Sequence, residues 1–318
     1  MTAERMAHTE PPTSVGNNRG MTTPRPSNVA VVGPGAIGTT VAAALHQVGL
    51  TPKLYGRTAR DQLELHTATD RIVVPGPVRV EVTDDVTPVD LVFLAVKSTQ
   101  IEAAAPWLGA LCRPHTVVCV LQNGVEQEES VAAHAPRCLV LPSVVWFPAQ
   151  AQADGSVWLR AEARLTVPDS EPGRTVAATL YQSLCTVEPA TDFLSSAWRK
   201  LMQNAVAGIM VLTGRRTGMF ARADIAELGL AYLRECLAVA QAEGADLGDE
   251  VPQQIIDAFR GYPPDMGTSI LADRQAGRPL EWDVRNGVVL RRGRRHGLPT
   301  PISDLLVPLL AAAGDGPG

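Results

Sequence analysis

The sequence lacks the features that mark disulfide-bonded, metal-binding and membrane-spanning proteins. The cysteines are odd in number and include no C-x-x-C pair: Cys112, Cys119, Cys138, Cys185 and Cys236. They indicate free thiols in a reducing compartment. The six histidines form no metal-ligand pattern with them, so no metal site is predicted. The N-terminal segment has no apolar h-region, and the apolar stretch 205–212 is too short to cross a bilayer. We therefore expect a cytoplasmic protein with no membrane partner.

An excess of basic charge is also absent. The 28 Lys and Arg residues are outnumbered by 33 Asp and Glu residues, which gives a net charge of −5. Nucleic-acid-binding surfaces usually carry an excess of Lys and Arg, so no nucleic-acid partner is predicted. The one basic run, residues 291–295, is interpreted as a solvated helix end.

The length and composition predict two globular domains behind an N-terminal tail. A chain of 318 residues has room for two domains of ordinary size, each with its own core. Residues 1–26 are rich in Thr, Pro, Asn and Gly, and we expect them to form a disordered tail. We place the two domains at residues 27–190 and 191–318.

Strands and helices alternate through the first domain. The apolar run 28–32 indicates a buried parallel strand, followed by a helix over 36–48 and a strand over 52–56. Further strands are expected over 90–96, 116–121, 138–146 and 157–167, and residues 72–82 indicate a hairpin. This α/β alternation predicts a Rossmann-type, doubly wound and mostly parallel sheet.

Helical patterns replace the strands near residue 190. Six helices are expected, over residues 196–212, 221–243, 252–259, 267–275, 281–295 and 302–312. The second domain is therefore predicted to be all-α, with a boundary near Thr191.

The turn after the first strand has the sequence Gly33-Pro34-Gly35-Ala36-Ile37-Gly38, which fits G-x-G-x-x-G. Gly33 would make the tight turn, Gly35 would admit a pyrophosphate, and Gly38 would let the helix pack against the strand. The start of the helix, at Ala36 and Ile37, offers free N–H groups to phosphates. A glycine-rich turn in a non-binding domain is the alternative, but the flanking strand and helix favour a dinucleotide site.

The end of the second predicted strand bears on the choice of cofactor. NAD sites usually carry an acidic residue there for the ribose 2′-OH, whereas this strand ends Tyr55-Gly56-Arg57. Arginine suits a 2′-phosphate, so the sequence favours NADPH over NADH. A solvated surface arginine is the alternative role for Arg57.

Polar residues follow two of the buried strands. Lys97 follows the strand 90–96, and Asn123 lies just beyond the strand 116–121. The carboxyl ends of parallel strands face the ligand crevice, so both side chains are candidates to contact cofactor or substrate. Each could instead be an ordinary polar residue at a strand end.

The helical half contributes a second set of candidates. Lys200 and Asn204 are four residues apart and share one helix face with apolar neighbours. Such a lysine either reaches solvent at the rim or is desolvated so that its pKa falls, as a general acid near neutral pH requires. Ser269 lies four residues before Asp273, and Glu281 follows; helix-surface and capping roles are the alternative for these.

Together these residues resemble the ketopantoate reductases (2-dehydropantoate 2-reductases). The resemblance runs from about Asn28 to Leu310. It rests on the glycine turn, Lys97, the segment 122–124, Trp198-Arg199-Lys200 with Asn204, the segment 269–281, Asn286-Gly287 and the segment 297–301.

The resemblance implies a chemistry and a set of residue roles. NADPH would deliver hydride to the ketone carbon of a 2-keto acid, while Lys200 acts as general acid on the developing alkoxide. Asn123 would serve the substrate and nicotinamide sites, Lys97 the cofactor site, and Ser269 the substrate carboxylate. Glu281 would hold or activate the substrate beside the cofactor, and Asn204 would help to bind the substrate. A cation facing the alkoxide stabilises charge that forms only in the transition state.

Two positions depart from the family pattern. Gly208 stands where many family members carry a second asparagine, one turn after Asn204, and Met266 replaces an asparagine three residues before Ser269. Both changes remove polar contacts to the substrate, so a reductase of a different 2-keto acid remains an alternative to 2-dehydropantoate reduction. A non-catalytic NADP-binding sensor is the third hypothesis. The expected partner is a small-molecule keto acid, and the sequence also permits a homodimer.

Overall fold

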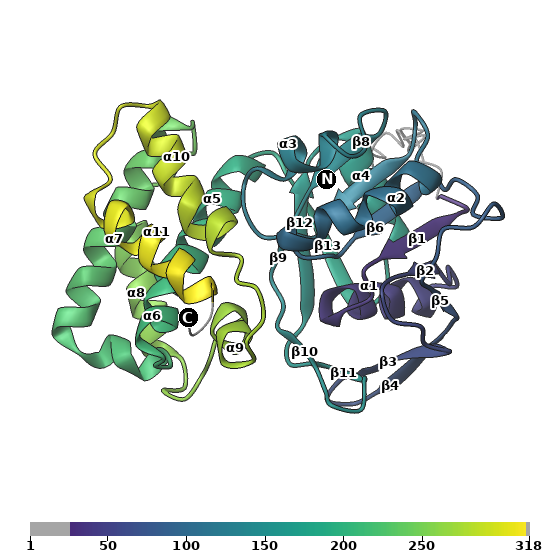
Figure 1. The fold of residues 1–318 in the computed structure, drawn as a ribbon, viewed down its shortest axis with the longest axis horizontal. Helices are drawn as coiled ribbons and strands as arrows, with labels where there is room; N and C mark the ends of the chain where they lie inside the picture. The colour runs from purple at the N-terminus through teal and green to yellow at the C-terminus, as the bar shows by residue number, and fades with distance from the viewer. Residues whose placement is uncertain (1–25, 316–318) are drawn as a thin grey trace, which may run out of the picture.

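The chain folds into an α/β half followed by a helical half, and the two lie side by side (Figure 1). The computed structural model describes residues 26–315, so the expected tail falls outside the described residues except at its last position. Within that range the last strand, β13 (Cys185–Ala190), ends shortly before helix α5 (Phe193–Val206), and only helices follow. The predicted fold class is confirmed.

A six-stranded parallel sheet forms the centre of the α/β half. The strand order is β5-β2-β1-β6-β7-β8, and every neighbouring pair is parallel. The strands are β1 (Val29–Val32), β2 (Lys53–Tyr55), β5 (Val78–Arg79), β6 (Leu91–Leu94), β7 (Val117–Val120) and β8 (Leu139–Pro142). The chain reverses its direction of winding between β1 and β6, and ligands of such sheets bind at this switch point, beyond the carboxyl ends of the strands.

Two smaller sheets complete this half. One has the order β10-β11-β3-β4 and the other the order β13-β12-β9. Their remaining strands are β3 (Gln62–His66), β4 (Arg71–Pro75), β9 (Val144–Val145), β10 (Ala149–Ala151), β11 (Val157–Leu159) and β12 (Ala163–Pro168).

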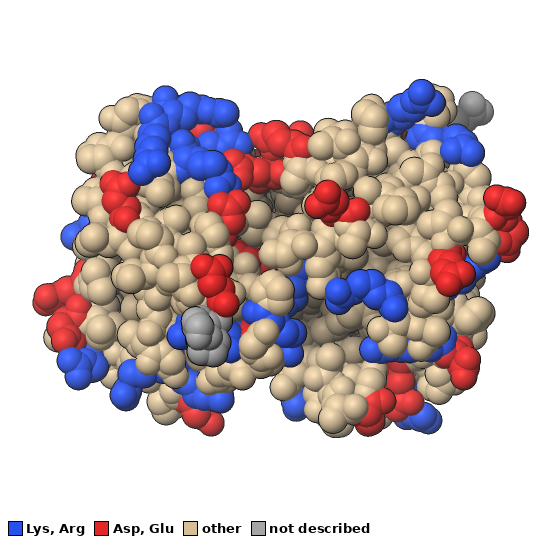
Figure 2. All heavy atoms as spheres, viewed as in Figure 1, with Lys and Arg blue, Asp and Glu red and all other residues tan. Residues whose placement is uncertain are grey.

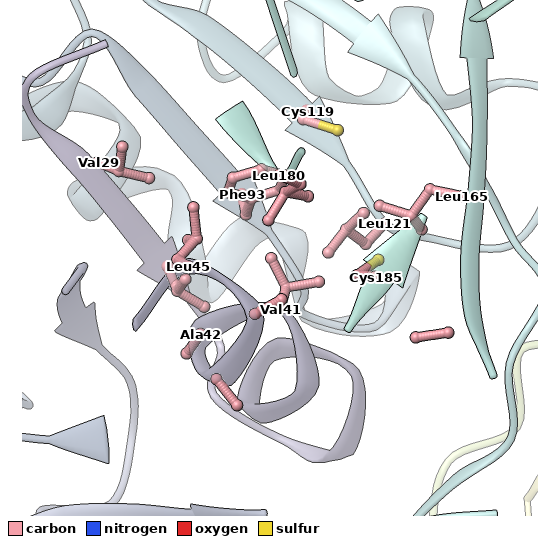
Figure 3. Close-up of a cluster of buried hydrophobic side chains, with 14 of the residues drawn as sticks. Val29, Val41, Ala42, Leu45, Phe93, Cys119, Leu121, Leu165, Leu180 and Cys185 are labelled. Atoms are coloured by element: carbon pink, nitrogen blue, oxygen red, sulfur yellow. The ribbon is translucent and has the colours of Figure 1, made fainter. Parts of the chain in front are cut away.

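Helices cover both faces of the six-stranded sheet. On one face, α1 (Ala36–Gln47) packs Val41 and Leu45 into a core that also contains Phe93 of β6 (Figure 3). On the other face, α2 (Ile101–Leu111) packs its buried side chains against alternate residues of the same strands. The strands are therefore apolar on both sides, which explains the continuous hydrophobic runs in the sequence. Two shorter helices, α3 (Gln127–Ala132) and α4 (Glu171–Thr179), complete the half.

The helical half has its own core, built around the fully buried Trp198, Phe220 and Tyr232. Its helices after α5 are α6 (Gly208–Thr213), α7 (Ala223–Ala242), α8 (Val251–Gly261), α9 (Ser269–Gln275), α10 (Val288–Arg295) and α11 (Pro301–Gly314). A π-helical turn, η3 (Asp283–Gly287), leads directly into α10. In residues 26–315, no helix is long and apolar enough to cross a membrane.

Several element predictions were wrong in detail. The hairpin expected over 72–82 does not form: β4 pairs antiparallel with β3, while β5 pairs parallel with β2 in the other sheet. The change of sheet falls at Gly76, where a side chain would collide with the Asp61 carbonyl oxygen. The strands expected over 138–146 and 157–167 each divide into two strands that belong to different sheets. The helix expected over 196–212 divides at Ala207 into α5 and α6.

The basic run 291–295 is only partly solvated. Arg291 and Arg292 of α10 form ion pairs with Glu126, at 2.6 and 3.2 Å, and Arg292 also reaches Glu129 of α3 at 2.9 Å. These pairs join the helical half to the α/β half, and Figure 2 shows basic and acidic side chains meeting between the halves at the top of the view. The prediction of a solvated helix end was therefore wrong for Arg292, whose side chain is 11% exposed, whereas Arg291 is exposed.

Candidate active site

The glycine turn between β1 and α1 has the shape that its sequence predicts. Gly33 has φ +87°, and a Cβ there would lie 2.6 Å from Cγ1 of Val96. A Cβ at Gly38 would collide with the Gly33 carbonyl oxygen, so α1 can pack this closely only with glycine at that position. At Gly35, by contrast, a Cβ would meet open space. The turn is therefore tight on its inner side and open at Gly35, where a ligand can approach the backbone.

The first turn of α1 offers free hydrogen-bond donors toward this open side. Within residues 26–315, no hydrogen bond uses the backbone N–H groups of Ala36, Ile37 or Gly38, and the first turn contains no acidic residue. Unpaired amides at a helix N-terminus bind anions. The residues present therefore fit the pyrophosphate of a dinucleotide.

Arg57 follows the end of β2 and is exposed. It makes no hydrogen bond or ion pair with another residue of the described range. An exposed guanidinium without a partner in the described range fits both roles considered for Arg57, the 2′-phosphate contact and the solvated surface residue.

The carboxyl edge of the six-stranded sheet meets the helical half. Lys97, which follows β6 after Ala95 and Val96, forms an ion pair of 2.5 Å with Asp273 of α9. Asp273 is 6% exposed and also accepts a hydrogen bond of 2.8 Å from Arg278. Lys97 and the segment 269–281, which were singled out separately in the sequence, are thereby brought together.

The buried carboxylate of Glu281 links the two halves. Its Oε1 accepts hydrogen bonds from the backbone N–H and the hydroxyl of Ser98, both at 3.1 Å. Its Oε2 accepts a hydrogen bond of 3.2 Å from Asn123 Nδ2, and Asn123 Oδ1 accepts one of 3.2 Å from Asn204 Nδ2. Glu281, Asn123 and Asn204 therefore form one polar chain across the junction of the two halves.

The close approach of the two halves depends on Gly124. Its φ is +105°, and a Cβ there would lie 3.1 Å from the carbonyl oxygen of Val284 in η3. Any side chain would strain the backbone and push against the π-helical turn. Glycine at this position lets the loop that carries Asn123 reach Glu281.

Lys200 lies at the same junction, on α5, with its side chain partly buried. Its Nζ is 5.0 Å from the ring centroid of Trp146, and Arg164 lies 5.3 Å from that ring. Burial, with added repulsion from Arg285 and Arg164, lowers the pKa of Lys200 to about 8. Lys200 and Asn123 line the same small hollow. The desolvation that a general acid near neutral pH requires is therefore present.

Ser269 is exposed at the first position of α9, and its Oγ accepts a hydrogen bond of 3.1 Å from Arg285 Nη2. Arg285, in η3, is only 2% exposed. The helix-capping role considered for Ser269 belongs instead to Thr268, whose Oγ1 accepts from the Leu271 N–H. The Ser269 hydroxyl remains available to a ligand.

Sequence reasoning missed three residues of this site: Ser98, Trp146 and Arg285. Ser98 directly follows Lys97, so its place at a strand end was a usable signal. Arg285 stands four residues after Glu281, a spacing that pairs opposite charges on a helix. Nothing in the sequence near Trp146 pointed to Lys200, because the two residues meet only through the packing of α5 on the α/β half.

The structure also explains Gly208. It is buried, and a Cβ there would lie 2.9 Å from Nδ2 of Asn286 and 3.1 Å from Cδ1 of Leu310. Asn286 donates hydrogen bonds to the Ala205 carbonyl oxygen at 2.9 Å and the Tyr232 hydroxyl at 3.0 Å. The amide of Asn286 therefore fills the space that a side chain at position 208 would need.

Met266, the second position that departs from the family pattern, is 40% exposed.

The fold and the site define a dinucleotide-dependent oxidoreductase of two halves. The α/β half provides the glycine turn with unpaired amides, and the helical half provides both a partly desolvated lysine and a buried carboxylate. Comparison with known proteins specifies the family. Residues 29–172 match the family model described as Ketopantoate reductase PanE/ApbA, and residues 192–313 match the model of its C-terminal part. The chain belongs to the ketopantoate reductase family.

Individual relatives cover almost the whole chain. A 2-dehydropantoate 2-reductase of Mycobacterium tuberculosis is 55% identical over 92% of this chain and 99% of its own length. A protein of the same name from Caulobacter vibrioides is 35% identical over 90% of this chain and 99% of its own length. The structure of a dimeric ketopantoate reductase from Staphylococcus aureus has a TM-score of 0.83 at 28% identity, and covers 92% of this chain and 100% of its own. Membership of this family implies a nicotinamide cofactor.

The packing around Gly208 generates a prediction about stability. Gly208→Asn should lower the free energy of unfolding by about 1–3 kcal/mol, the usual cost of overpacking a core, because the new side chain must displace Asn286. Denaturant unfolding of Gly208→Asn measures this loss, with Gly261→Asn as the control, since a Cβ at Gly261 meets open space. Equal stability of the two variants would contradict the packing described here.

Proposed function

We propose that the protein reduces 2-dehydropantoate to (R)-pantoate with NADPH, as an enzyme of pantothenate biosynthesis. The observation that carries this proposal is the polar chain Asn204–Asn123–Glu281 beside Lys200 at the junction of the two halves. The 55% identity to a relative named 2-dehydropantoate 2-reductase supports the choice of substrate. We propose further that the two halves are separate domains with a boundary near Thr191.

NADPH, when bound, supplies the hydride that the ketone carbon accepts. The free amides of Ala36, Ile37 and Gly38 would hold the pyrophosphate, and Gly35 leaves the space for it. Arg57 would pair with the 2′-phosphate, because its guanidinium has no partner among the described residues. Lys97 and Asn123, at the carboxyl ends of β6 and β7, would border the nicotinamide end of the site.

Lys200 would donate the proton that the keto oxygen requires. With its pKa lowered to about 8, the ammonium is still mostly protonated at neutral pH and gives up its proton more readily than an ordinary lysine. Its positive charge would also stabilise the alkoxide as it forms. Asn204 and Asn123 would orient the substrate, Ser269 would bind its carboxylate, and Glu281 would hold the amide of Asn123 in place.

Lys200, Asn123 and Glu281 argue against the sensor hypothesis, since a protein that only binds NADP does not need a desolvated lysine at the same junction as a buried carboxylate. We also propose a homodimer, supported by the Staphylococcus aureus relative that is described as dimeric. We propose a cytoplasmic location, which fits five cysteines without a disulfide, because proteins of reducing compartments rarely form disulfides.

The proposed activity is tested by following NADPH oxidation at 340 nm with a panel of 2-keto acids. We expect the highest kcat/KM with 2-dehydropantoate. Faster turnover of another 2-keto acid would identify that acid as the substrate instead. Met266 would then be the first position to examine. Cofactor binding without any turnover would contradict the enzyme assignment.

Loss of Lys200 should affect catalysis far more than cofactor binding. Lys200→Ala should lower kcat by about 10²–10⁴-fold or more, because it removes both a general acid and a charge that acts in the transition state. The wild-type kcat/KM should fall as the pH rises through about 8, where the free enzyme loses the Lys200 proton, and this limb should vanish in the variant.

The control for Lys200→Ala is Lys53→Ala, because Lys53 is the exposed first residue of β2. The two variants should bind NADPH equally well. A folded Lys200→Ala enzyme that keeps kcat within a few-fold of wild type would remove Lys200 from the mechanism and make Lys97 the better candidate for the acid.

The choice between NADPH and NADH depends on Arg57. Arg57→Ala should weaken NADPH binding by about 1.5–3 kcal/mol, the usual contribution of a hydrogen bond to a charged group, and should leave NADH binding nearly unchanged. Titration of both cofactors into wild type and variant measures this difference. An equal loss for the two cofactors would show that Arg57 does not contact the 2′-phosphate.

A further inference from the structure

Arg285 is a buried cation whose hydrogen-bonding capacity is largely unused. Its side chain is 3% exposed, yet it makes a single hydrogen bond within residues 26–315, from Nη2 to Ser269 Oγ at 3.1 Å. Its Nε is buried without a partner. Buried polar groups are nearly always hydrogen-bonded, and a guanidinium has five donors. The unpaired donors of Arg285 therefore call for an explanation.

Glu281 does not satisfy Arg285. The nearest approach, from Nη2 to Oε2 of Glu281, is 3.8 Å, which is an ion-pair distance but too long for a hydrogen bond. Both oxygens of Glu281 already accept hydrogen bonds from Ser98 and Asn123. The other buried carboxylate nearby, Asp273, is paired with Lys97 and Arg278. Arg285 thus lies near two carboxylates but keeps hydrogen-bond donors that neither of them accepts from.

The bond between Arg285 and Ser269 determines what the serine can do. A hydroxyl has one hydrogen to donate, and Ser269 Oγ already acts as acceptor toward Arg285. Its hydrogen is therefore free to point away from Arg285. Because Ser269 is exposed whereas Arg285 is buried beneath it, an incoming group meets the serine as a donor with a positive charge behind it.

We propose that Arg285 is a specificity-determining residue that makes this site select a carboxylate over a neutral group at the same end of the substrate. Arg285 fixes the Ser269 hydroxyl as a donor and supplies a positive charge that compensates for the negative charge of the bound carboxylate. This inference rests on the proposed reduction of a 2-keto acid, whose carboxylate would lie against Ser269. A purely structural ion pair with Glu281 is the competing role.

The test compares a 2-keto acid with its own primary amide, which is similar in shape but uncharged. For wild type and Arg285→Met, kcat and KM are measured with 2-dehydropantoate and with its amide, together with the KM for NADPH and the thermal unfolding midpoint. Arg234→Met, at an exposed position of α7, is the matched control.

Arg285→Met should lower kcat/KM for the acid by about 10- to 100-fold, the effect of losing a hydrogen bond that involves a charged group. This loss in kcat/KM should come mainly from a higher KM for the acid. The kcat/KM for the amide and the KM for NADPH should each change by less than about threefold. The ratio of kcat/KM for the acid to kcat/KM for the amide should therefore fall. Arg285→Lys keeps the charge without the planar fork and should retain part of the preference.

An equal loss for acid and amide would overturn the proposal and leave Arg285 with a structural role. If Arg285→Met does not fold, Arg285→Lys decides the matter by the same ratio, because an unequal loss supports the proposal and an equal loss overturns it. The proposed function is judged separately by wild-type turnover. If the wild type prefers another 2-keto acid, that acid and its amide become the test pair.

Discussion

The buried carboxylate of Glu281 is the interaction on which the rest of the site depends. A carboxylate that is 6% exposed is costly unless hydrogen bonds satisfy its oxygens. Glu281 belongs to the helical half, but the groups that satisfy it, Ser98 and Asn123, belong to the α/β half. Separating the halves would leave the carboxylate without these partners. The free-energy cost of losing these hydrogen bonds keeps the two halves together. Asn204 and Lys200 therefore lie opposite the ends of β6 and β7.

The same junction gives Lys200 its chemistry. Packing α5 against the α/β half removes water from the ammonium group, and the face of Trp146 is a weak substitute for that water. Arg164 and Arg285 add like charge, so the protonated form is further disfavoured and the pKa falls. The ion pairs of Arg291 and Arg292 with Glu126 join the halves again at the surface, where water and salt screen them.

The sequence predicts the parts of this structure that local patterns determine. The order of strands and helices around the glycine turn follows from apolar runs and glycines, and the residues that form the polar chain were each visible as polar residues at strand ends or at helical spacing. The distribution of the shorter strands among three sheets was not predictable, because β5 pairs with β2 and β11 pairs with β3, and the partners in each pair are far apart in the sequence.

Within the site, the roles of Gly208 and Arg285 depend on tertiary packing, which the sequence could not indicate. Gly208 suggested a missing substrate contact, whereas in the fold its space is taken by Asn286, a residue 78 positions later. Arg285 looked like part of an ordinary helix. In the structure, residues 283–287 form a π-helical turn in which both Arg285 and Asn286 are buried, and Arg285 contacts Ser269. A π-helical turn changes which side chains face inward, and such turns are frequent at functional sites.

The central claim is that the junction of the two halves desolvates Lys200, and a direct titration of that residue tests it. The chain contains only three lysines, Lys53, Lys97 and Lys200, so NMR of a sample with labelled lysine side chains gives few signals. The signal that is missing from Lys200→Ala belongs to Lys200. We predict that this signal titrates near pH 8 in the free protein. Titration near the ordinary lysine value of about 10.4 would contradict the account.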